Sequence, residues 1–88
     1  MPSDRELLDE FTRSGSEGAF RTLVERHLDL VHSVARRVTH NDDLARDVCQ
    51  GVFLKLATRP DDVPRGLKLL AWLHRTSRHK AIDGHLHL

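Results

Sequence analysis

Few side chains in this 88-residue sequence could take part directly in covalent or metal chemistry. Its one cysteine, Cys49, lies beside Val48 and Val52 in an apolar stripe, where a buried and unreactive thiol is expected. No two of the seven histidines stand four residues apart, as a chelating pair on a helix would, and the close pair His85 and His87 lies at the chain end. The sequence therefore predicts no metal site and no cofactor.

The common catalytic motifs are absent from the sequence. It contains no glycine-rich phosphate loop, no G-x-S-x-G, no H-E-x-x-H, no paired cysteines and no tyrosine. A chain of this length buries only about 60 to 68% of its unfolded surface, which leaves no room for a deep cofactor cavity. We therefore predict that the protein is not an enzyme; the alternative is a small helical enzyme that uses Cys49 and a histidine.

The sequence contains more residues suited to binding than to catalysis. The first group of them is a polar set that precedes Phe53. The set lies within two helical turns and comprises Asp43, Arg46, Asp47 and Gln50. Asp47 and Gln50 are three residues apart and therefore neighbours on a helix. Together they offer a carboxylate and an amide to a basic partner surface. The alternative is an ordinary solvated polar face.

The second set of binding residues is basic and surrounds one aromatic side chain, Trp72. Its members are Arg65, Lys68, Arg75, Arg78, His79 and Lys80. Cations neutralise phosphates, and an indole can stack on an unpaired base, so this combination is typical of a surface that binds single-stranded nucleic acid. The alternative for Trp72 is a place in the hydrophobic core.

The net charge of +1 hides an uneven distribution of charge along the chain. Residues 1–62 contain nine Lys and Arg against twelve Asp and Glu, whereas residues 63–88 contain five against one. An acidic body with a basic end suggests two different partners. A solvated basic face at the end of a helical domain is the alternative.

Helices must position these residues, because apolar side chains recur at spacings of three and four along most of the chain. Ser3 and Glu6 have the spacing of a capping box and begin a short first helix that ends at Gly15. Ser16 is the expected N-cap of a long second helix over about residues 17–39.

Two further helices are predicted in the second half of the chain. Asn41 and Asp42 cap a third helix, and the two prolines and one glycine of residues 59–66 exclude helix from the loop that follows. A fourth helix begins at Leu67, with Gly84 as its terminator. The predicted fold is all-α, a compact bundle of about four helices in a single domain.

The sequence also carries expectations about location. The first twenty residues contain charges where a secretory signal needs an apolar run. No apolar stretch approaches the roughly 18 residues that span a bilayer. We therefore expect a cytoplasmic protein with no membrane partner.

Three blocks of sequence, taken together, resemble the region-two domain of bacterial RNA polymerase sigma factors of the extracytoplasmic-function (ECF) type. They are ARRV at residues 35–38, ARDVCQGVFL at 45–54 and WLHRTSRHKAID at 72–83. The resemblance covers nearly the whole chain, from about residue 18 to residue 83. It implies a single sigma region-two domain over residues 1–88.

The resemblance implies two binding functions. The third helix, through Asp43, Arg46, Asp47, Gln50 and Phe53, would contact the clamp helices of the largest subunit of RNA polymerase. The following loop and last helix, about residues 60–66 and 72–80, would bind the minus-ten promoter element for transcription initiation. There they would capture a flipped base of the non-template strand and hold melted promoter DNA. An anti-sigma factor is a further possible partner.

The sequence departs from the family pattern at several positions. Arg46 and Gly51 occupy positions where the family often has acids, and His79 stands where many members have asparagine. The family's second domain, a helix-turn-helix, has no counterpart in these residues. The rival hypothesis is a degenerate sigma-like interaction module that binds a regulator and does not melt DNA.

Overall fold

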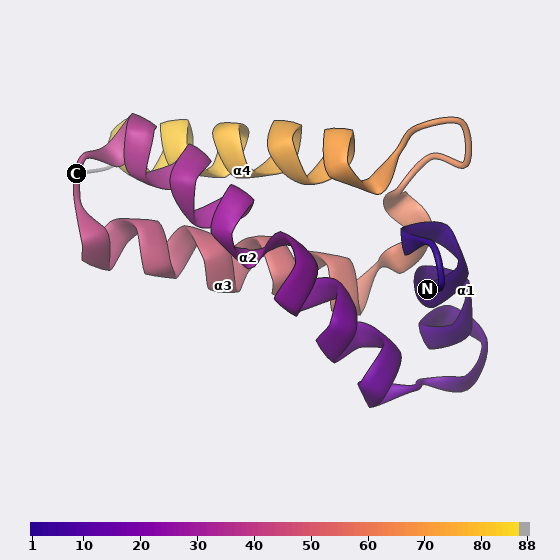
Figure 1. Cartoon of the computed structure of the whole chain (residues 1–88). Coiled ribbons are helices and arrows are strands. Elements are labelled where there is room, and N and C mark those ends of the chain that lie inside the picture. The colour runs from indigo at the N-terminus through magenta and orange to yellow at the C-terminus, as the bar shows by residue number, and fades with distance from the viewer. Residues whose placement is uncertain (87–88) are drawn as a thin grey trace.

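Side-chain caps begin the first three helices at the positions that the sequence predicts. The computed structural model describes residues 1–86. Ser3, Ser16 and Asn41 each accept a hydrogen bond from the backbone amide three residues later, and they begin α1 (Asp4–Ser14), α2 (Glu17–Thr39) and α3 (Asp42–Thr58) (Figure 1). The predicted capping box is present. The first three helices are thereby confirmed.

Residues in the left-handed conformation end the first two helices. Gly15, with φ of 69°, ends α1 as predicted, and His40, with φ of 53°, ends α2. The amide of His40 donates to the carbonyl of Arg36 over 2.9 Å, which closes the last turn of α2. Only His40 and Asn41 connect α2 to α3, so these two helices form a tight antiparallel hairpin.

The connection from α3 to α4 differs in detail from the prediction. Pro60–Asp62 forms one 3-10 turn, which the proline permits because the first position of a helix needs no amide donor. α4 (Leu69–Leu86) begins two residues later than predicted, because the amide of Leu67 bonds to the carbonyl of Pro64 in a turn. The prediction that Gly84 ends this helix is wrong; a glycine inside a helix costs only about 1 kcal/mol.

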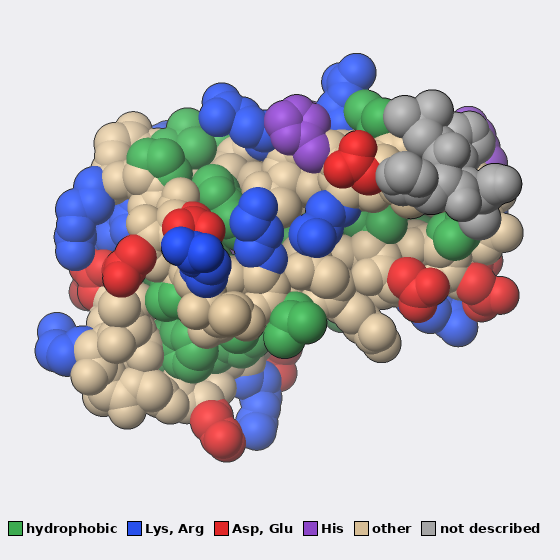
Figure 2. Space-filling view, turned by 180° about the vertical axis from the view of Figure 1, so that it is seen from behind, with side chains coloured by type: hydrophobic (Ala, Val, Ile, Leu, Met, Phe, Trp, Pro, Cys, Tyr) green, Lys and Arg blue, Asp and Glu red, His purple; other side chains and the backbone are tan. Residues whose placement is uncertain are grey.

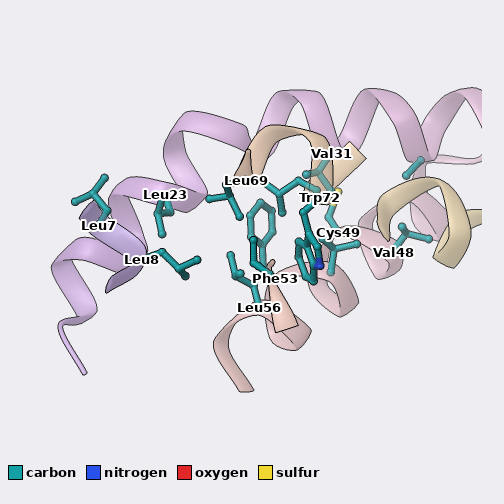
Figure 3. Close-up of a cluster of buried hydrophobic side chains, with 14 of the residues drawn as sticks. Leu7, Leu8, Leu23, Val31, Val48, Cys49, Phe53, Leu56, Leu69 and Trp72 are labelled. Carbon is teal, nitrogen blue, oxygen red and sulfur yellow. The ribbon is translucent and has the colours of Figure 1, made fainter. Parts of the chain in front are cut away.

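The four helices pack around one core. In Figure 1, α3 and α4 run antiparallel, α2 crosses both, and α1 lies at the end of the molecule beside the α3–α4 connection. All four helices contribute buried side chains, among them Leu8, Leu23, Val31, Leu56 and Leu73 (Figure 3). Residues 1–86 contain no strand, and the predicted all-α bundle is confirmed.

Polar and aromatic contacts hold α1 on α2. The carboxylate of Asp4 accepts from Arg26 Nη1 over 3.2 Å and lies 2.8 Å from His27 Nε2. At the other end of α1, the rings of Phe11 and Phe20 pack with their centroids 4.8 Å apart. Because both ends of α1 are attached, the helix has a defined position on the bundle.

A candidate docking face and a candidate nucleic-acid cleft

The whole polar set of α3 is open to solvent. Its four members, Asp43, Arg46, Asp47 and Gln50, are all exposed. Arg46 Nη1 lies 4.0 Å from Asp43 Oδ1, and both side chains are more than two-thirds exposed, so their ion pair contributes little stability. These groups therefore remain available to a partner.

Phe53 does not belong to this exposed surface. Its side chain is only 7% exposed and packs beside Leu56 and Trp72 in the core (Figure 3). The prediction that Phe53 contacts a partner is therefore corrected: its ring is needed inside the bundle. The residue that sequence reasoning missed is its neighbour Leu54, which is 67% exposed.

Leu54 shares a helix face with the acids of the polar set. Asp43, Asp47, Gln50 and Leu54 follow the spacing of four, three and four residues that lines one side of a helix. That spacing was the available signal for Leu54. We call Asp43, Arg46, Asp47, Gln50 and Leu54 the docking face. It combines carboxylates, an amide and one apolar anchor.

Gly51 lies where the docking face meets α4, because it lines one pocket with Asp47 of α3 and Lys80 of α4. A Cβ atom built on Gly51 would meet Lys80 Cδ at 3.6 Å and Lys80 Nζ at 3.7 Å, so the lysine stem crosses α3 at this point. The acid that the family often has at this position would therefore lie beneath Lys80. Asp47 and Gln50 are exposed although this acid is absent.

Replacing Gly51 by alanine should stabilise the protein. The new methyl group would make ordinary van der Waals contact with a flexible side chain, and a helix interior favours alanine over glycine by about 1 kcal/mol. The midpoint of urea unfolding should therefore rise at unchanged slope. Gly84→Ala, near the end of α4, should give a smaller rise because that turn is closer to the helix end. A lower midpoint for Gly51→Ala would show that Lys80 cannot move aside.

A cleft of about 490 Å³ lies between α3, the loop and α4. Nine residues line it, and we call it the α3–α4 cleft: Lys55, Asp62, Pro64, Trp72, Arg75, Thr76, His79, Lys80 and Asp83. Figure 2 shows Lys, Arg and His side chains gathered along the α4 side of the molecule. The cleft thus opens on a surface that attracts anions.

The α3–α4 cleft brings together Trp72 and three of the six residues of the predicted basic set: Arg75, His79 and Lys80. The other three residues of the set lie elsewhere. Arg65 and Lys68 line a separate hollow near the start of α1. Arg78 lies across α4 in a groove with Arg37 and His74. The basic residues of the sequence therefore form three separate groups in the structure.

Trp72 contributes little exposed surface to the cleft. Its side chain is 7% exposed and packs in the core near Cys49 (Figure 3). The core alternative is therefore the observed one, and the predicted stacking role for this ring is corrected. Trp72 instead lines the cleft as part of a rigid apolar wall.

Sequence reasoning missed two charged members of the cleft, Lys55 and Asp83, whereas a third, Asp62, lies in the loop at residues 60–66 for which the resemblance implies DNA binding. Asp62 Oδ2 lies 3.5 Å from Arg59 Nε in an exposed pair. Lysine and arginine side chains are hydrogen-bond donors, and carboxylates are acceptors. A cleft with both kinds of group can bind the polar edge of a base as well as a phosphate.

Cys49 carries no activated thiol. It is 6% exposed, and burial raises the pKa of the thiol because the thiolate would lose its hydration. The enzyme alternative therefore lacks its nucleophile. Among the side chains that the structure describes, those of residues 1–84, no group of three or more His, Cys, Asp or Glu could hold a metal ion. The close pair His85 and His87 falls outside the side chains that the structure describes.

The fold and these surfaces define a small all-helical binding domain with an exposed helix face and a basic cleft. The family described as Sigma-70 region 2 matches residues 23–87, which is most of the chain. The protein therefore belongs to this family of sigma-factor domains, which act in transcription initiation, bind RNA polymerase and bind DNA. No curated protein and no solved structure matches the chain.

No helix in the described part of the chain is long and apolar enough to cross a membrane.

Proposed function

We propose that the domain attaches to RNA polymerase through the docking face and holds melted promoter DNA in the α3–α4 cleft. The docking partner is the pair of clamp helices of the largest polymerase subunit. The DNA is the non-template strand of the minus-ten element, with one flipped base. The observation that carries the proposal is that one family domain presents both an exposed polar helix face and a cleft lined by cations.

The docking face suits a basic helical partner. Its carboxylates and amide are exposed acceptors, and charge-assisted hydrogen bonds are about twice as strong as neutral ones. Leu54 adds an exposed apolar side chain beside them. Interfaces of this kind gain specificity from the charges and much of their affinity from a central anchor.

The α3–α4 cleft suits an unpaired nucleotide. One wall is the loop at Pro64, another is α4, and Lys55 reaches in from the last turns of α3. The buried ring of Trp72 makes the inner wall rigid. A stiff pocket lowers the cost of holding a base outside the duplex, and the cations bind the backbone on each side.

The ECF type is part of the proposal. It is supported by the three blocks of sequence at residues 35–38, 45–54 and 72–83, which lie within the family match at residues 23–87. The activity proposed for these residues is docking, binding of the minus-ten element and strand capture, without catalysis.

The test is to measure two binding equilibria with the unmodified protein after circular dichroism has shown it to be helical. Calorimetry measures binding to a fragment that carries the polymerase clamp helices. Fluorescence anisotropy measures binding to a labelled single-stranded oligonucleotide of minus-ten sequence, with and without that fragment. Micromolar or tighter clamp binding, followed by sequence-dependent oligonucleotide binding, supports the proposal. A folded protein that binds neither ligand would favour the rival module that binds a regulator.

A further inference from the structure

The N-terminal helix α1 lies outside the family match at residues 23–87 and yet contacts the loop that forms one wall of the cleft. Arg5 Nη2 on α1 donates to the carbonyl of Pro64 over 3.0 Å. The same carbonyl accepts the amide of Leu67, also over 3.0 Å. One oxygen atom therefore joins α1, the loop turn and the segment that leads into α4.

Further contacts attach the loop to α1 on both sides of Pro64. Arg65 Nη2 lies 3.5 Å from Asp9 Oδ1. Val63 is 2% exposed and, with Leu8, lines the small cavity between α1 and the 3-10 turn. Apolar burial and polar contacts thus act on three consecutive loop residues.

α1 is itself held in place, so it can restrain the loop. The carboxylate of Asp4, one residue before Arg5, binds both Arg26 and His27 of α2. The restraint therefore runs from the body of α2 through the first turn of α1 to Pro64. Few hydrogen bonds within the loop hold its shape. In its backbone, the amides of Asp62, Val63 and Leu67 donate to the carbonyls of Arg59, Pro60 and Pro64, respectively.

We propose that Arg5 is a positioning residue for the α3–α4 cleft. Its hydrogen bond holds the Pro64 turn in place, so that the loop wall of the cleft is already formed before a nucleotide enters. The part of this inference that concerns nucleotide binding rests on the proposed function, whereas the part that concerns the position of the loop does not. A preformed wall lowers the entropy that binding would otherwise cost.

The first test measures the loop without any ligand. Arg5→Ala is compared with Arg21→Ala, which removes the same charge from an exposed position on α2. Amide hydrogen exchange is followed by NMR at Leu67, in the turn, and at Leu73, in the core. One hydrogen bond is worth about 1 kcal/mol, so exchange at Leu67 should become roughly fivefold faster in Arg5→Ala.

Three outcomes decide this test. Faster exchange at Leu67 with unchanged exchange at Leu73 supports the inference, because the effect is then local. Equal exchange at Leu67 in Arg5→Ala and Arg21→Ala would overturn it. Equal acceleration at both amides would also overturn it, because Arg5 would then stabilise the whole fold and not the loop.

The second test measures the cleft with the single-stranded minus-ten oligonucleotide as probe. Arg5→Ala should weaken binding roughly fivefold more than Arg21→Ala does, because the freed loop must be ordered on binding. Arg5→Lys, which keeps the charge and a donor, should recover part of the loss. If the unmodified protein binds no oligonucleotide, the proposed function fails while the exchange result still decides the inference. Binding by Arg5→Ala equal to that of Arg21→Ala would contradict a role in the cleft.

Discussion

Replacing Asp47 and Gln50 together by alanine should weaken binding to the polymerase clamp helices about 100-fold, with no loss of helicity. Truncating an interface residue that contributes to affinity costs about 1 to 2 kcal/mol, and a loss of about 1.4 kcal/mol at each of the two positions gives this factor. Both side chains are exposed on α3, so the fold does not depend on them. Isothermal titration calorimetry with the clamp fragment measures the change.

The matched control is Glu10→Ala, which removes one negative charge from an exposed position on α1. It should leave the dissociation constant nearly unchanged at physiological salt, because distant surface charges are screened. Leu54→Ala tests the apolar part of the docking face and should also weaken binding without unfolding the protein, since Leu54 is 67% exposed. Equal affinities for the double variant and the control would remove the docking face from the proposal.

Replacing Lys55 and Arg75 together by alanine should weaken binding of the single-stranded minus-ten oligonucleotide at least tenfold at low salt. Both residues line the α3–α4 cleft, from opposite walls. Each cation that neutralises a phosphate of a single strand adds about 0.7 to the slope of log affinity against log salt, so the slope should fall by roughly 1.4. Anisotropy titrations at several salt concentrations measure both quantities.

The control for this experiment is Arg13→Ala with Arg21→Ala, which removes two exposed cations from α1 and α2. Its salt slope should stay close to that of the unmodified protein. Arg78→Ala separates the cleft from the neighbouring groove, because Arg78 lies on the other side of α4. A slope that falls equally in the cleft variant and in the control would mean that the cleft attracts DNA no more than the rest of the surface does.

Local signals in the sequence were sufficient for most of the fold. Ser3, Ser16 and Asn41 were correctly identified as caps, because a cap depends on the three residues that follow it. The prediction at Gly84 was wrong because a glycine ends a helix only where the backbone turns away from the helix axis. The backbone of α4 continues as a helix through Gly84 to Leu86. The 3-10 turn at residues 60–62 was also missed, because a proline permits a first turn as readily as it excludes a later one.

The candidate site was harder to predict, because it depends on how the helices pack. Phe53 continues the apolar stripe of Cys49 and is buried, whereas Leu54 continues the polar spacing and is exposed. The helical pattern indicated both positions, but the family resemblance assigned the partner contact to Phe53. Lys55 lines the cleft because α3 and α4 run antiparallel, which brings the end of α3 beside the first turns of α4. This packing of the helices is not encoded in any short motif. Trp72 is close to the basic residues in sequence, which suggested that it stacks on a base, but it is buried in the core. The sequence alone could not distinguish stacking from core packing.

The burial of Cys49 has a practical consequence for spectroscopy. This side chain is the protein's one thiol, and its raised pKa and 6% exposure make it slow to react with maleimides. A cysteine introduced at an exposed position such as Ser33 or Thr58 would therefore take a fluorophore or spin label selectively in the wild-type background. Distances from such a label to a labelled DNA strand could then be followed during assembly, without first repacking the core around a Cys49 substitution.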